Sequence, residues 1–431
     1  MIPILRANDA EALQKRVMNR SQLQNDEVSR RVKEIVARVR AEGDAALFEY
    51  TARFDRAEIT AENILVTREE IDAAYKAASP EWLEAMREAA RRVTAFHEKQ
   101  RQNTWVDFQP GMALGQKITP LERVGVYVPG GTAAYPSSVL MNVLPAKVAG
   151  VKEIIMVTPP GPDGGVSYPL ALVAADIAGV DRIYKVGGAQ AVAALAFGTQ
   201  SVPRVDKITG PGNIYVANAK REVFGHVGID MVAGPSEVLV IADGSVNASY
   251  VAADLLSQAE HDPLAAAILV TDSVAVAFAV QAELDRQAAL LPRKDVIFQS
   301  LENFGTIVVA DSLSECAGIA NQIAPEHLEL CVEEPYALLP QIQNAGAVFL
   351  GYWSPEPLGD YFAGPNHVLP TSGTARFFSP LSVDDFVKKT SIICCTREEL
   401  RAVSGQVQLL ARQEGLDAHA NAVAIRFAKE E

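Results

Sequence analysis

The chain has 431 residues, of which 49% are hydrophobic and 21% charged, and its formal net charge is −14. This length predicts two or more domains with a large buried core, and the balance of residues is that of an ordinary globular protein. The acidic excess, without a basic stripe interleaved with aromatic residues, argues against nucleic-acid binding.

The N-terminal segment MIPILRANDAEALQKR lacks the basic, apolar and small-residue regions of a secretory signal peptide. No apolar run approaches the roughly 20 residues needed to span a bilayer, so we expect no membrane partner. The four cysteines have neither CxxC spacing nor a disulfide-rich pattern: Cys316, Cys331, Cys394 and Cys395. We expect them to be small apolar side chains in a reducing cytoplasm.

The first hundred residues are charged and predicted to be mostly helical. Within residues 26–55, five apolar residues recur at the spacing of an amphipathic helix: Val28, Val32, Ile35, Val36 and Val39. A second helix is predicted to begin after Ser79, a preferred N-cap residue, with Pro80 in its first turn. His97 lies on this charged helix and is predicted to be a surface residue.

From about residue 124, short β-branched runs alternate with alanine-rich helical segments. Six runs end in Gly, Pro or Asp and are predicted to be buried strands: EIIMVTPPG, RIYKVGG, EVLVIADG, AAILVTD, TIVVADS and GAVFLGY. This alternation indicates βαβ units, and therefore parallel sheets with helices on their faces. Val-Ala-Ala-Asp occurs twice, at 173–176 and 251–254, a short match that does not by itself establish duplicated α/β halves.

Three segments place glycines between a predicted strand and a predicted helix: RVGVYVPGGTAAYPSSVLMN, VGGAQAVAALAFG and ITGPGNIYVANAK. A nucleotide-binding loop has this layout, but none of the three has the GxGxxG spacing of a Rossmann fingerprint. Tight turns in an α/β sheet explain each loop equally well, so both interpretations remain open.

Titratable residues gather at the ends of predicted elements. In IAPEHLEL, Glu326 and His327 stand side by side between a helix and a strand, either as a solvated strand end or as an acid–base pair. In LLSQAEHDP, Gln258 and His261 are three residues apart and share a helix face, which an ordinary polar face also explains.

Two further segments contain groups that can bind a metal. Asp360 and His367 lie in residues 354–377, a Gly- and Pro-rich stretch whose length is typical of a functional loop. Glu414 and His419 lie where the chain enters its final helix and, alone, indicate only a capped helix. Together, Gln258, His261, Asp360 and His419 offer two imidazoles and two oxygens, which suits Zn²⁺ in a catalytic site, although spacing does not show that they meet.

Long segments of the chain occur in the order found in the histidinol dehydrogenase family: ERVGVYVPGG, GGAQAVAALAFGT, ITGPGN, AGPSEVLVIAD, LLSQAEHDP, IAPEHLEL, LGDYFAGPNHVLPTSGTARF and EGLDAHANA. The sequence therefore resembles this family over essentially its whole length. The resemblance implies a zinc-dependent, NAD-linked dehydrogenase that oxidises L-histidinol to L-histidinal and then to L-histidine, the last step of histidine biosynthesis.

The resemblance also implies roles for individual residues. Glu326 and His327 correspond to the acid–base pair of the family. The implied ligands of one zinc ion per subunit are Gln258, His261, Asp360 and His419. The implied substrate contacts are Ser236, Gln258, His261, His327, Asp360, Glu414 and His419. The implied NAD contacts are Tyr127, Gln190 and Asn213.

The predicted fold is α/β, with two Rossmann-like parallel-sheet domains, one of them discontinuous, and small helical extensions at both ends. We expect a helical arm over 1–25, a larger α/β domain over 26–126 and 236–381 with most zinc and catalytic residues, and an NAD-binding α/β domain over 127–235. Residues 382–431 are expected to form a helical dimerisation unit. The resemblance implies that its Glu414 and His419 reach the active site of the other subunit of a homodimer.

Our hypothesis for the chemistry is that His327 takes the proton of the alcohol and Glu326 activates the water that adds to the aldehyde. Zinc would mainly position the imidazole and amine nitrogens of the substrate.

Three alternatives remain at this stage. A dehydrogenase of the same family could act on another small amino alcohol or polyol, although Ser236 and Glu414 argue against this. A zinc hydrolase could use the same titratable groups, but the glycine loops with Tyr127, Gln190 and Asn213 favour NAD. A scaffold protein would leave the cluster of titratable groups without a role.

Overall fold

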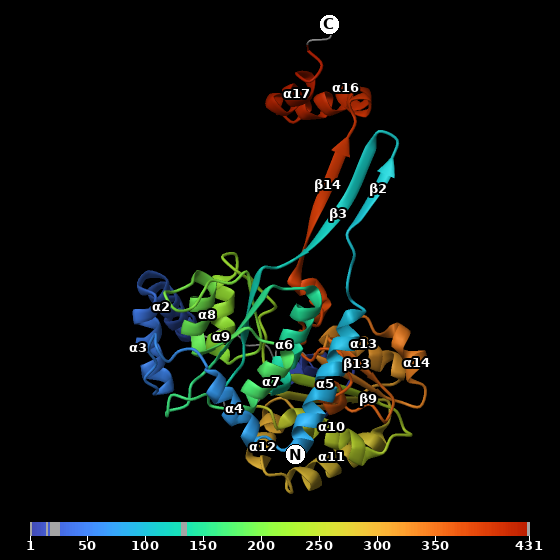
Figure 1. Cartoon of the computed structure of the whole chain (residues 1–431). Coiled ribbons are helices and arrows are strands. Elements are labelled where there is room, and N and C mark those ends of the chain that lie inside the picture. The colour runs from blue at the N-terminus through green and yellow to red at the C-terminus, as the bar shows by residue number, and fades with distance from the viewer. Residues whose placement is uncertain (1, 14–15, 18–25, 131–135, 429–431) are drawn as a thin grey trace. The chain divides into compact units, whose positions relative to one another are not determined.

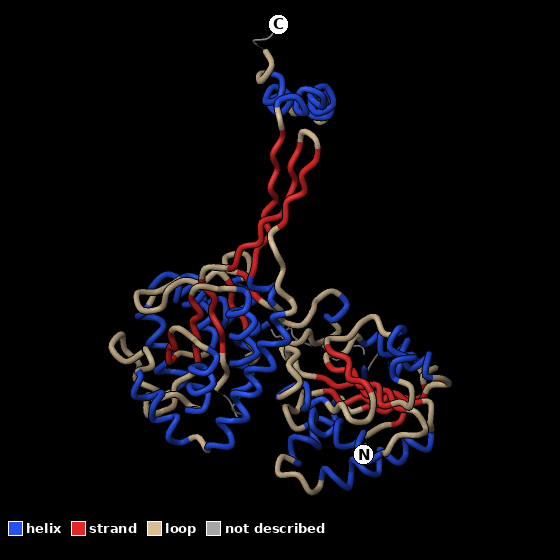
Figure 2. The backbone as a smooth tube through the Cα atoms, turned by 45° about the vertical axis from the view of Figure 1, so that its right-hand side comes forward, coloured by secondary structure: helices blue, strands red, loops and turns tan. Residues whose placement is uncertain are grey.

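The computed structural model describes residues 2–13, 16–17, 26–130 and 136–428. The chain divides into two compact units, of which unit 1 comprises Met1–Gln100 and Leu121–Phe386, and unit 2 comprises Arg101–Pro120 and Val387–Glu431. Unit 1 contains two parallel sheets flanked by helices (Figure 2), as the fold prediction requires. No helix of the described residues is both long and apolar enough to cross a membrane.

The six-stranded sheet of unit 1 is parallel throughout. Its order is β1 (Ile4–Arg6), β11 (Thr306–Val309), β10 (Ala266–Thr271), β9 (Glu237–Ala242), β12 (His327–Cys331) and β13 (Ala347–Leu350). One face packs against α10 (Ala248–Ala259), α11 (Val274–Ala288) and α12 (Lys294–Asn303). The other packs against α13 (Leu313–Ile323) and α14 (Pro335–Leu338), which continues into the 3₁₀ helix Leu339–Gln341.

The five-stranded sheet of unit 1 is also parallel. Its order is β6 (Arg182–Lys185), β5 (Glu153–Thr158), β4 (Arg123–Tyr127), β7 (Lys207–Thr209) and β8 (Gly228–Ile229). One face packs against α6 (Pro136–Ala149) and α7 (Pro169–Ala178). The other packs against α8 (Gly188–Phe197) and α9 (Ile214–Val223).

The two sheets share one strand order. In each, the first long strand of the sheet in sequence is central, the next two follow on one side, and the fourth and fifth lie on the other. The six strands predicted from apolar runs are all present, as β5, β6, β9, β10, β11 and β13. The repeated Val-Ala-Ala-Asp falls on α7 and α10, which follow the second strand of one sheet and the first of the other. The short sequence match therefore does not mark equivalent positions in the two sheets.

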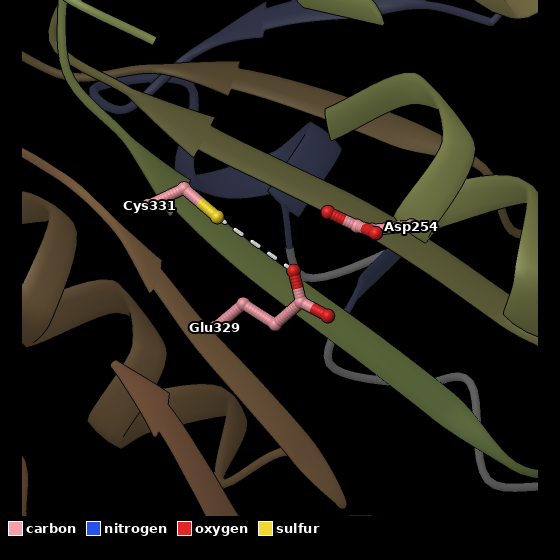
Figure 3. A group of neighbouring side chains, drawn as sticks. All are labelled: Asp254, Glu329 and Cys331. Atoms are coloured by element: carbon pink, nitrogen blue, oxygen red, sulfur yellow. Dashed lines mark hydrogen bonds between the residues drawn. The ribbon is translucent and has the colours of Figure 1, made fainter. Parts of the chain in front are cut away.

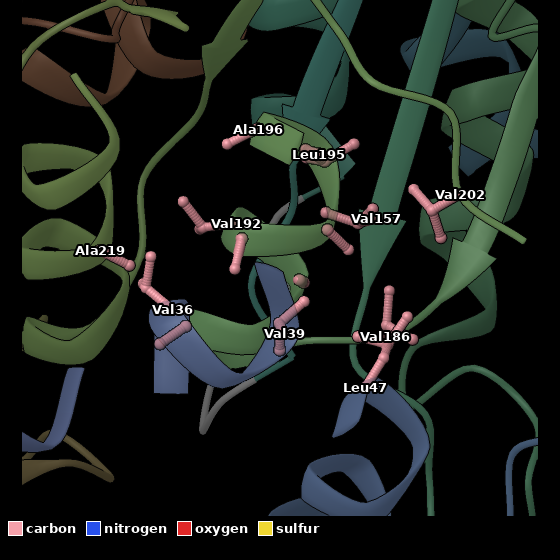
Figure 4. Close-up of a cluster of buried hydrophobic side chains, with 14 of the residues drawn as sticks. Val36, Val39, Leu47, Val157, Val186, Val192, Leu195, Ala196, Val202 and Ala219 are labelled. Atoms are coloured by element: carbon pink, nitrogen blue, oxygen red, sulfur yellow. The ribbon is translucent and has the colours of Figure 1, made fainter. Parts of the chain in front are cut away.

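The N-terminal helices pack against the core of the five-stranded sheet. They are α2 (Asp26–Glu42), α3 (Asp44–Asp55), α4 (Arg68–Ala77) and α5 (Pro80–Glu98). The predicted apolar stripe of α2 is buried, and its Val36 and Val39 pack with Val192 of α8 (Figure 4). Helices α4 and α5 contribute to the core around α6 and α7.

Two details of the N-terminal prediction are wrong. Residues 2–13 are not purely helical, because β1 pairs with β11 before the single turn α1 (Ala10–Leu13); the rest of the expected arm lies largely outside the described residues. His97 is not a surface residue, because its side chain is 0% exposed. Its Nδ1 lies 2.7 Å from Gln100 Oε1, and its Nε2 lies 3.3 Å from Asn366 Nδ2.

Unit 2 combines an antiparallel sheet with two helices (Figure 1). The sheet has the order β14 (Val387–Cys395), β3 (Met112–Pro120) and β2 (Trp105–Gln109), and it is followed by α16 (Arg397–Gln413) and α17 (Asp417–Ala424). The helices of the predicted C-terminal unit are therefore present, but its first strand and the hairpin at 105–120 were not expected. Among its described residues, only Ala411 and Ala420 are buried.

Candidate active site

Glu326 and His327 lie at the amino end of β12, an interior strand of the six-stranded sheet. Helix α13 ends at Ile323, and Ala324 ends it in the left-handed conformation (φ 50°), so the chain turns sharply into the strand. Glu326 is 5% exposed and His327 is 4% exposed. A solvated strand end is therefore excluded, and the two groups are buried where a charge is costly.

A single residue, Glu237 at the start of β9, contacts both members of this pair through its backbone. Its N–H donates to Glu326 Oε2 (2.9 Å), and its carbonyl lies 3.1 Å from His327 Nδ1. Because a carbonyl oxygen only accepts, Nδ1 must carry the proton of the imidazole, which leaves the lone pair on Nε2. His327 Nε2 has no hydrogen-bond partner among the described residues.

Burial controls the protonation of the pair. It lowers the pKa of His327 to about 3, with His367 and His261 acting in the same direction, so the imidazole is neutral. Burial also raises the pKa of Glu326 well above its usual value, and the nearby carboxyl groups of Glu237, Asp360 and Glu356 add to this effect.

The short helix α15 (Glu356–Tyr361) brings two more carboxyl groups to His327. Asp360 Oδ1 lies 3.8 Å from His327 Nε2 and 3.7 Å from His367 Nδ1. His367 Nδ1 also lies 3.0 Å from the carbonyl of Asp360, and its Nε2 lies 3.4 Å from Ser138 Oγ. Burial raises the pKa of Asp360 to about 6, and burial followed by the charge of Asp360 raises that of Glu356 to about 8.

Gln258 lies in the last turn of α10, and His261 follows two residues after the helix ends. Gln258 Nε2 lies 2.9 Å from His261 Nδ1, and the buried Gln258 Oε1 has no hydrogen-bond partner among the described residues. Ser257 Oγ donates to Glu356 Oε2 (2.8 Å) and so connects α10 to α15. His261 is near enough to His327 and Glu356 to lower the pKa of each.

The donor atoms of this cluster fit a divalent metal ion. His327, Glu356 and Asp360 each offer one ligand atom, and these atoms lie within 4.8 Å of one another. Beside them, Gln258 Oε1 is a buried acceptor without a donor. Nitrogen and oxygen donors in this proportion suit a borderline ion such as Zn²⁺, and a cation would offset the cost of burying several carboxyl groups together.

The remaining predicted residues of the metal and substrate sets lie elsewhere. Ser236 is half-buried and directly precedes Glu237, so it adjoins the acid–base pair in sequence. Glu414 ends α16 and His419 lies on α17, and both are exposed. Both belong to unit 2, so the compact unit that gathers the other predicted residues does not contain them.

The three predicted NAD contacts lie at the carboxyl ends of strands of the five-stranded sheet. Tyr127 ends β4, and its hydroxyl accepts from Gly188 N–H (3.0 Å) at the start of α8. Gln190 is buried in the first turn of α8, and Asn213 caps α9 by accepting from two backbone N–H groups. Beta-strands β4 and β7 flank the point where the strand order reverses, which is where open α/β sheets bind dinucleotides.

Sequence reasoning did not single out several residues in or beside the candidate sites. Glu356 stands four residues before Asp360, a spacing that could have indicated one helix face. Asp55 accepts from Gln190 Nε2 at 3.5 Å, and burial raises its pKa to about 6, but nothing in its sequence context indicates this position. Glu237 contributes through its backbone, which no side-chain pattern reports.

Comparisons with known proteins point to one family over almost the whole chain. The sequence model of the histidinol dehydrogenase family matches residues 18–427. A histidinol dehydrogenase of Caldanaerobacter subterraneus subsp. tengcongensis is 59% identical over 412 residues, covering 96% of this chain and 95% of the relative. That of Moorella thermoacetica is 54% identical over 427 residues, covering 99% and 100%. The crystal structure of histidinol dehydrogenase from Elizabethkingia anophelis has a TM-score of 0.93 at 38% identity, covering 99% of this chain and 98% of the other.

Proposed function

Because the chain belongs to the histidinol dehydrogenase family, whose members are NAD-dependent oxidoreductases of the last step of histidine biosynthesis, we propose that it oxidises L-histidinol to L-histidine through L-histidinal. The observation that supports this chemistry most directly is the buried, neutral His327, whose unprotonated Nε2 lies in a cluster of carboxyl groups. A general base for an alcohol requires such a lone pair.

In the first oxidation, His327 Nε2 takes the hydroxyl proton of the substrate while hydride leaves the carbinol carbon for NAD. The hydrogen bond from Nδ1 to the Glu237 carbonyl keeps the imidazole in the required tautomer and orientation. Burial keeps the imidazole neutral at neutral pH, so its lone pair is available when the alcohol binds.

In the second oxidation, Glu326 in its ionised form removes a proton from the water that adds to the aldehyde while His327 returns its proton to the aldehyde oxygen, and His327 then accepts a proton again as hydride leaves for a second NAD. The Glu237 N–H, which donates to Glu326 Oε2, holds the carboxyl group beside the imidazole, with Oε2 3.7 Å from His327 Nδ1. One buried site can therefore serve both steps without releasing the aldehyde.

The metal of this site would be zinc, one ion per subunit, held by Gln258, His261 and Asp360 together with His419 of a second subunit. When bound, it would anchor the nitrogen atoms of the substrate and favour the ionised form of the neighbouring carboxyl groups. The unpartnered Gln258 Oε1 and the raised pKa of Asp360 support this ligand set. Ser236 and Glu414 complete the substrate contacts that we propose.

NAD would bind the five-stranded sheet at its reversal point, in contact with Tyr127, Gln190 and Asn213. The position of these residues at the ends of β4, β6 and β7 supports this placement.

We further propose a homodimer whose active sites are shared between subunits. Unit 2 supports this, because its described residues bury little and leave many large apolar side chains exposed: Trp105, Val106, Phe108, Leu114, Ile393, Val407, Leu409, Leu410, Leu416 and Ile425. A second copy of the chain would cover such surfaces.

The four cysteines are unpaired, which supports the reducing cytoplasm as the compartment.

The test of the proposed function is the amount of NADH released for each L-histidinol consumed, with and without a chelator. We expect two NADH for each substrate, loss of activity on chelation, and recovery with Zn²⁺. One NADH would mean that oxidation stops at the aldehyde and that the role of Glu326 is wrong. No NADH from L-histidinol, but activity with another amino alcohol or polyol, would assign a different substrate to the same machinery.

A further inference from the structure

A carboxyl group lies in the middle of an interior strand, where a hydrophobic residue would be ordinary. Glu329 of β12 is 1% exposed and belongs to a strand that pairs with β9 on one side and β13 on the other. Because side chains alternate along a strand, Glu329 shares one face of the sheet with His327 and Cys331. That face also packs against α10.

Glu329 contacts two other elements at once. Its Oε1 accepts the backbone N–H of Glu356, the first residue of α15, at 2.8 Å. Its Oε2 accepts from the thiol of Cys331 at 3.7 Å, and Asp254 of α10 lies beside it, with one polar atom of each of these three residues within 4.8 Å of the other two (Figure 3). Two carboxyl groups can hydrogen-bond only if one is protonated. Burial and the charge of Asp254 raise the pKa of Glu329 well above its usual value, and burial raises that of Asp254 to about 6, so two neighbouring carboxyl groups here favour sharing one proton.

The three elements that meet at Glu329 carry the candidate zinc ligands and the candidate base. His327 lies two residues before Glu329 on β12. On α10, Asp254 lies one turn before Gln258. On α15, Glu356 lies one turn before Asp360. Glu329 and its two neighbours on α10 and α15 therefore each lie within four residues of a group that must meet the others.

We propose that Glu329 is a positioning residue that fixes α10 and α15 against β12, so that Asp360 is held in register with Gln258, His261 and His327. This inference rests on the metal site proposed above. Glu329 itself contacts no proposed ligand atom and no reacting atom. A methionine of similar size would fill the same space without desolvating a polar group, so a role in stability alone does not account for the carboxyl group.

The test compares two substitutions of similar size in the full-length chain. In Glu329→Gln, the amide oxygen can still accept from Glu356 N–H and the amide nitrogen can donate to the neighbouring Asp254, whereas Glu329→Met can do neither. Zinc affinity, measured by competition with a chelator, should change by less than about threefold in E329Q and weaken by about 10–100-fold in E329M, as for other partners of metal ligands.

A matched control is Leu330→Ala, which creates a cavity on the opposite face of the same strand, where Leu330 is fully buried. L330A should lower the melting temperature and leave zinc affinity unchanged, whereas E329M should weaken zinc binding without a comparable loss of melting temperature. If E329M and L330A affect zinc affinity equally, Glu329 acts through general stability and the inference is wrong.

A second readout needs no metal. In the chelated protein, hydrogen exchange of the amides of residues 356–361 should be faster in E329M than in wild type, and unchanged in E329Q and L330A. Failure of the wild type to bind zinc would overturn the proposed metal site, whereas unchanged exchange in E329M would overturn the role of Glu329. The two failures are therefore distinguishable.

Discussion

At the scale of single residues, the peptide groups of Glu237 organise the candidate acid and base. Its N–H binds Glu326 and its carbonyl binds His327, so the two side chains are held by one short stretch of β9. The sequence predicts that a carboxylate and an imidazole act together there. It could not predict which imidazole nitrogen holds the proton, because that depends on a backbone group far away in the chain.

Replacement of Glu326 by Gln should separate the two oxidations. The amide oxygen can still accept from Glu237 N–H, but the side chain can no longer take a proton from water. We expect oxidation of L-histidinal to slow by about 10²–10³-fold while oxidation of L-histidinol changes much less. The rates of NADH formation from each substrate measure this difference, and an equal loss in both steps would contradict the assigned roles.

His97 should make the protein sensitive to mild acid. Burial lowers its pKa below 6.5, while the histidine of the unfolded chain keeps the ordinary value. As pH falls below 6.5, the unfolded state binds a proton that the folded state does not, so stability is lost. The loss is at most about 1.4 kcal/mol for each pH unit, until the folded pKa is reached.

Urea unfolding of wild type and His97→Gln between pH 7.5 and 5 tests this expectation. The variant should be less stable than wild type at pH 7.5, because its contacts to Gln100 and Asn366 change, but the gap should narrow as pH falls. A gap that stays constant with pH would show that His97 titrates alike in both states.

At the scale of elements, burial decides which predictions succeed. The six strands predicted from continuous apolar runs are all found, because each belongs to a parallel sheet that is covered on both faces. Strands β2 and β14 were missed because most of their residues are exposed, so no apolar pattern marks them. Strand β1 was missed because it has only three residues and is recognisable only by its pairing with β11.

In the candidate site, contacts between residues close in the chain were predictable, and contacts between distant residues were not. Sequence reasoning alone found pairs close in the chain, such as Gln258 with His261, which are in contact in the structure. It could not show that α15 approaches α10, because Ser257 and Glu356 are 99 residues apart. Their hydrogen bond depends on packing against β12, which sequence spacing does not encode.

A buried ion pair fixes the loop that precedes α9. Lys220 and Asp230 form a salt bridge, and each also binds Gly210: Lys220 Nζ donates to its carbonyl (3.0 Å), and its N–H donates to Asp230 Oδ2 (2.8 Å). Gly210 has φ 114°, and a Cβ there would lie 2.1 Å from the carbonyl oxygen of Tyr127. The pair therefore holds the loop close to β4.

Removing one partner of this pair should be costly. Lys220→Met leaves Asp230 buried without its cation, which should lower the free energy of unfolding by about 3–5 kcal/mol in urea titrations. The double variant Lys220→Met/Asp230→Leu should recover part of that loss, because no charge then remains unpaired. A single variant as stable as wild type would show that solvent reaches Asp230.

At the scale of the whole molecule, the proposed sharing of active sites predicts complementation between inactive subunits. His327→Ala and His419→Ala should each be inactive as homodimers. Unfolding, mixing in equal amounts and refolding should restore about one quarter of wild-type activity, because half of the dimers are hybrids and each hybrid has one intact site of two.

Size-exclusion chromatography with light scattering provides the control, since both variants should remain dimers. No recovery from mixed dimers would mean that His419 serves the subunit to which it belongs. As a negative control, a mixture of Glu414→Gln with His419→Ala should recover no activity even if sites are shared. In a hybrid of these two variants, each active site receives a substituted unit 2 from the other subunit.

The two candidate sites of unit 1 lie at opposite ends of the strands of its two parallel sheets. Tyr127, Gln190 and Asn213 lie at the carboxyl edge, where α8 and α9 begin, and the backbone dipoles of those helices direct partial positive charge at this edge. Glu326 and His327 lie at the amino edge of the other sheet, where α10 and α13 end with partial negative charge. The first edge suits the phosphates of a dinucleotide and the second suits a cation. One repeated topology thus offers two sites of opposite electrical polarity.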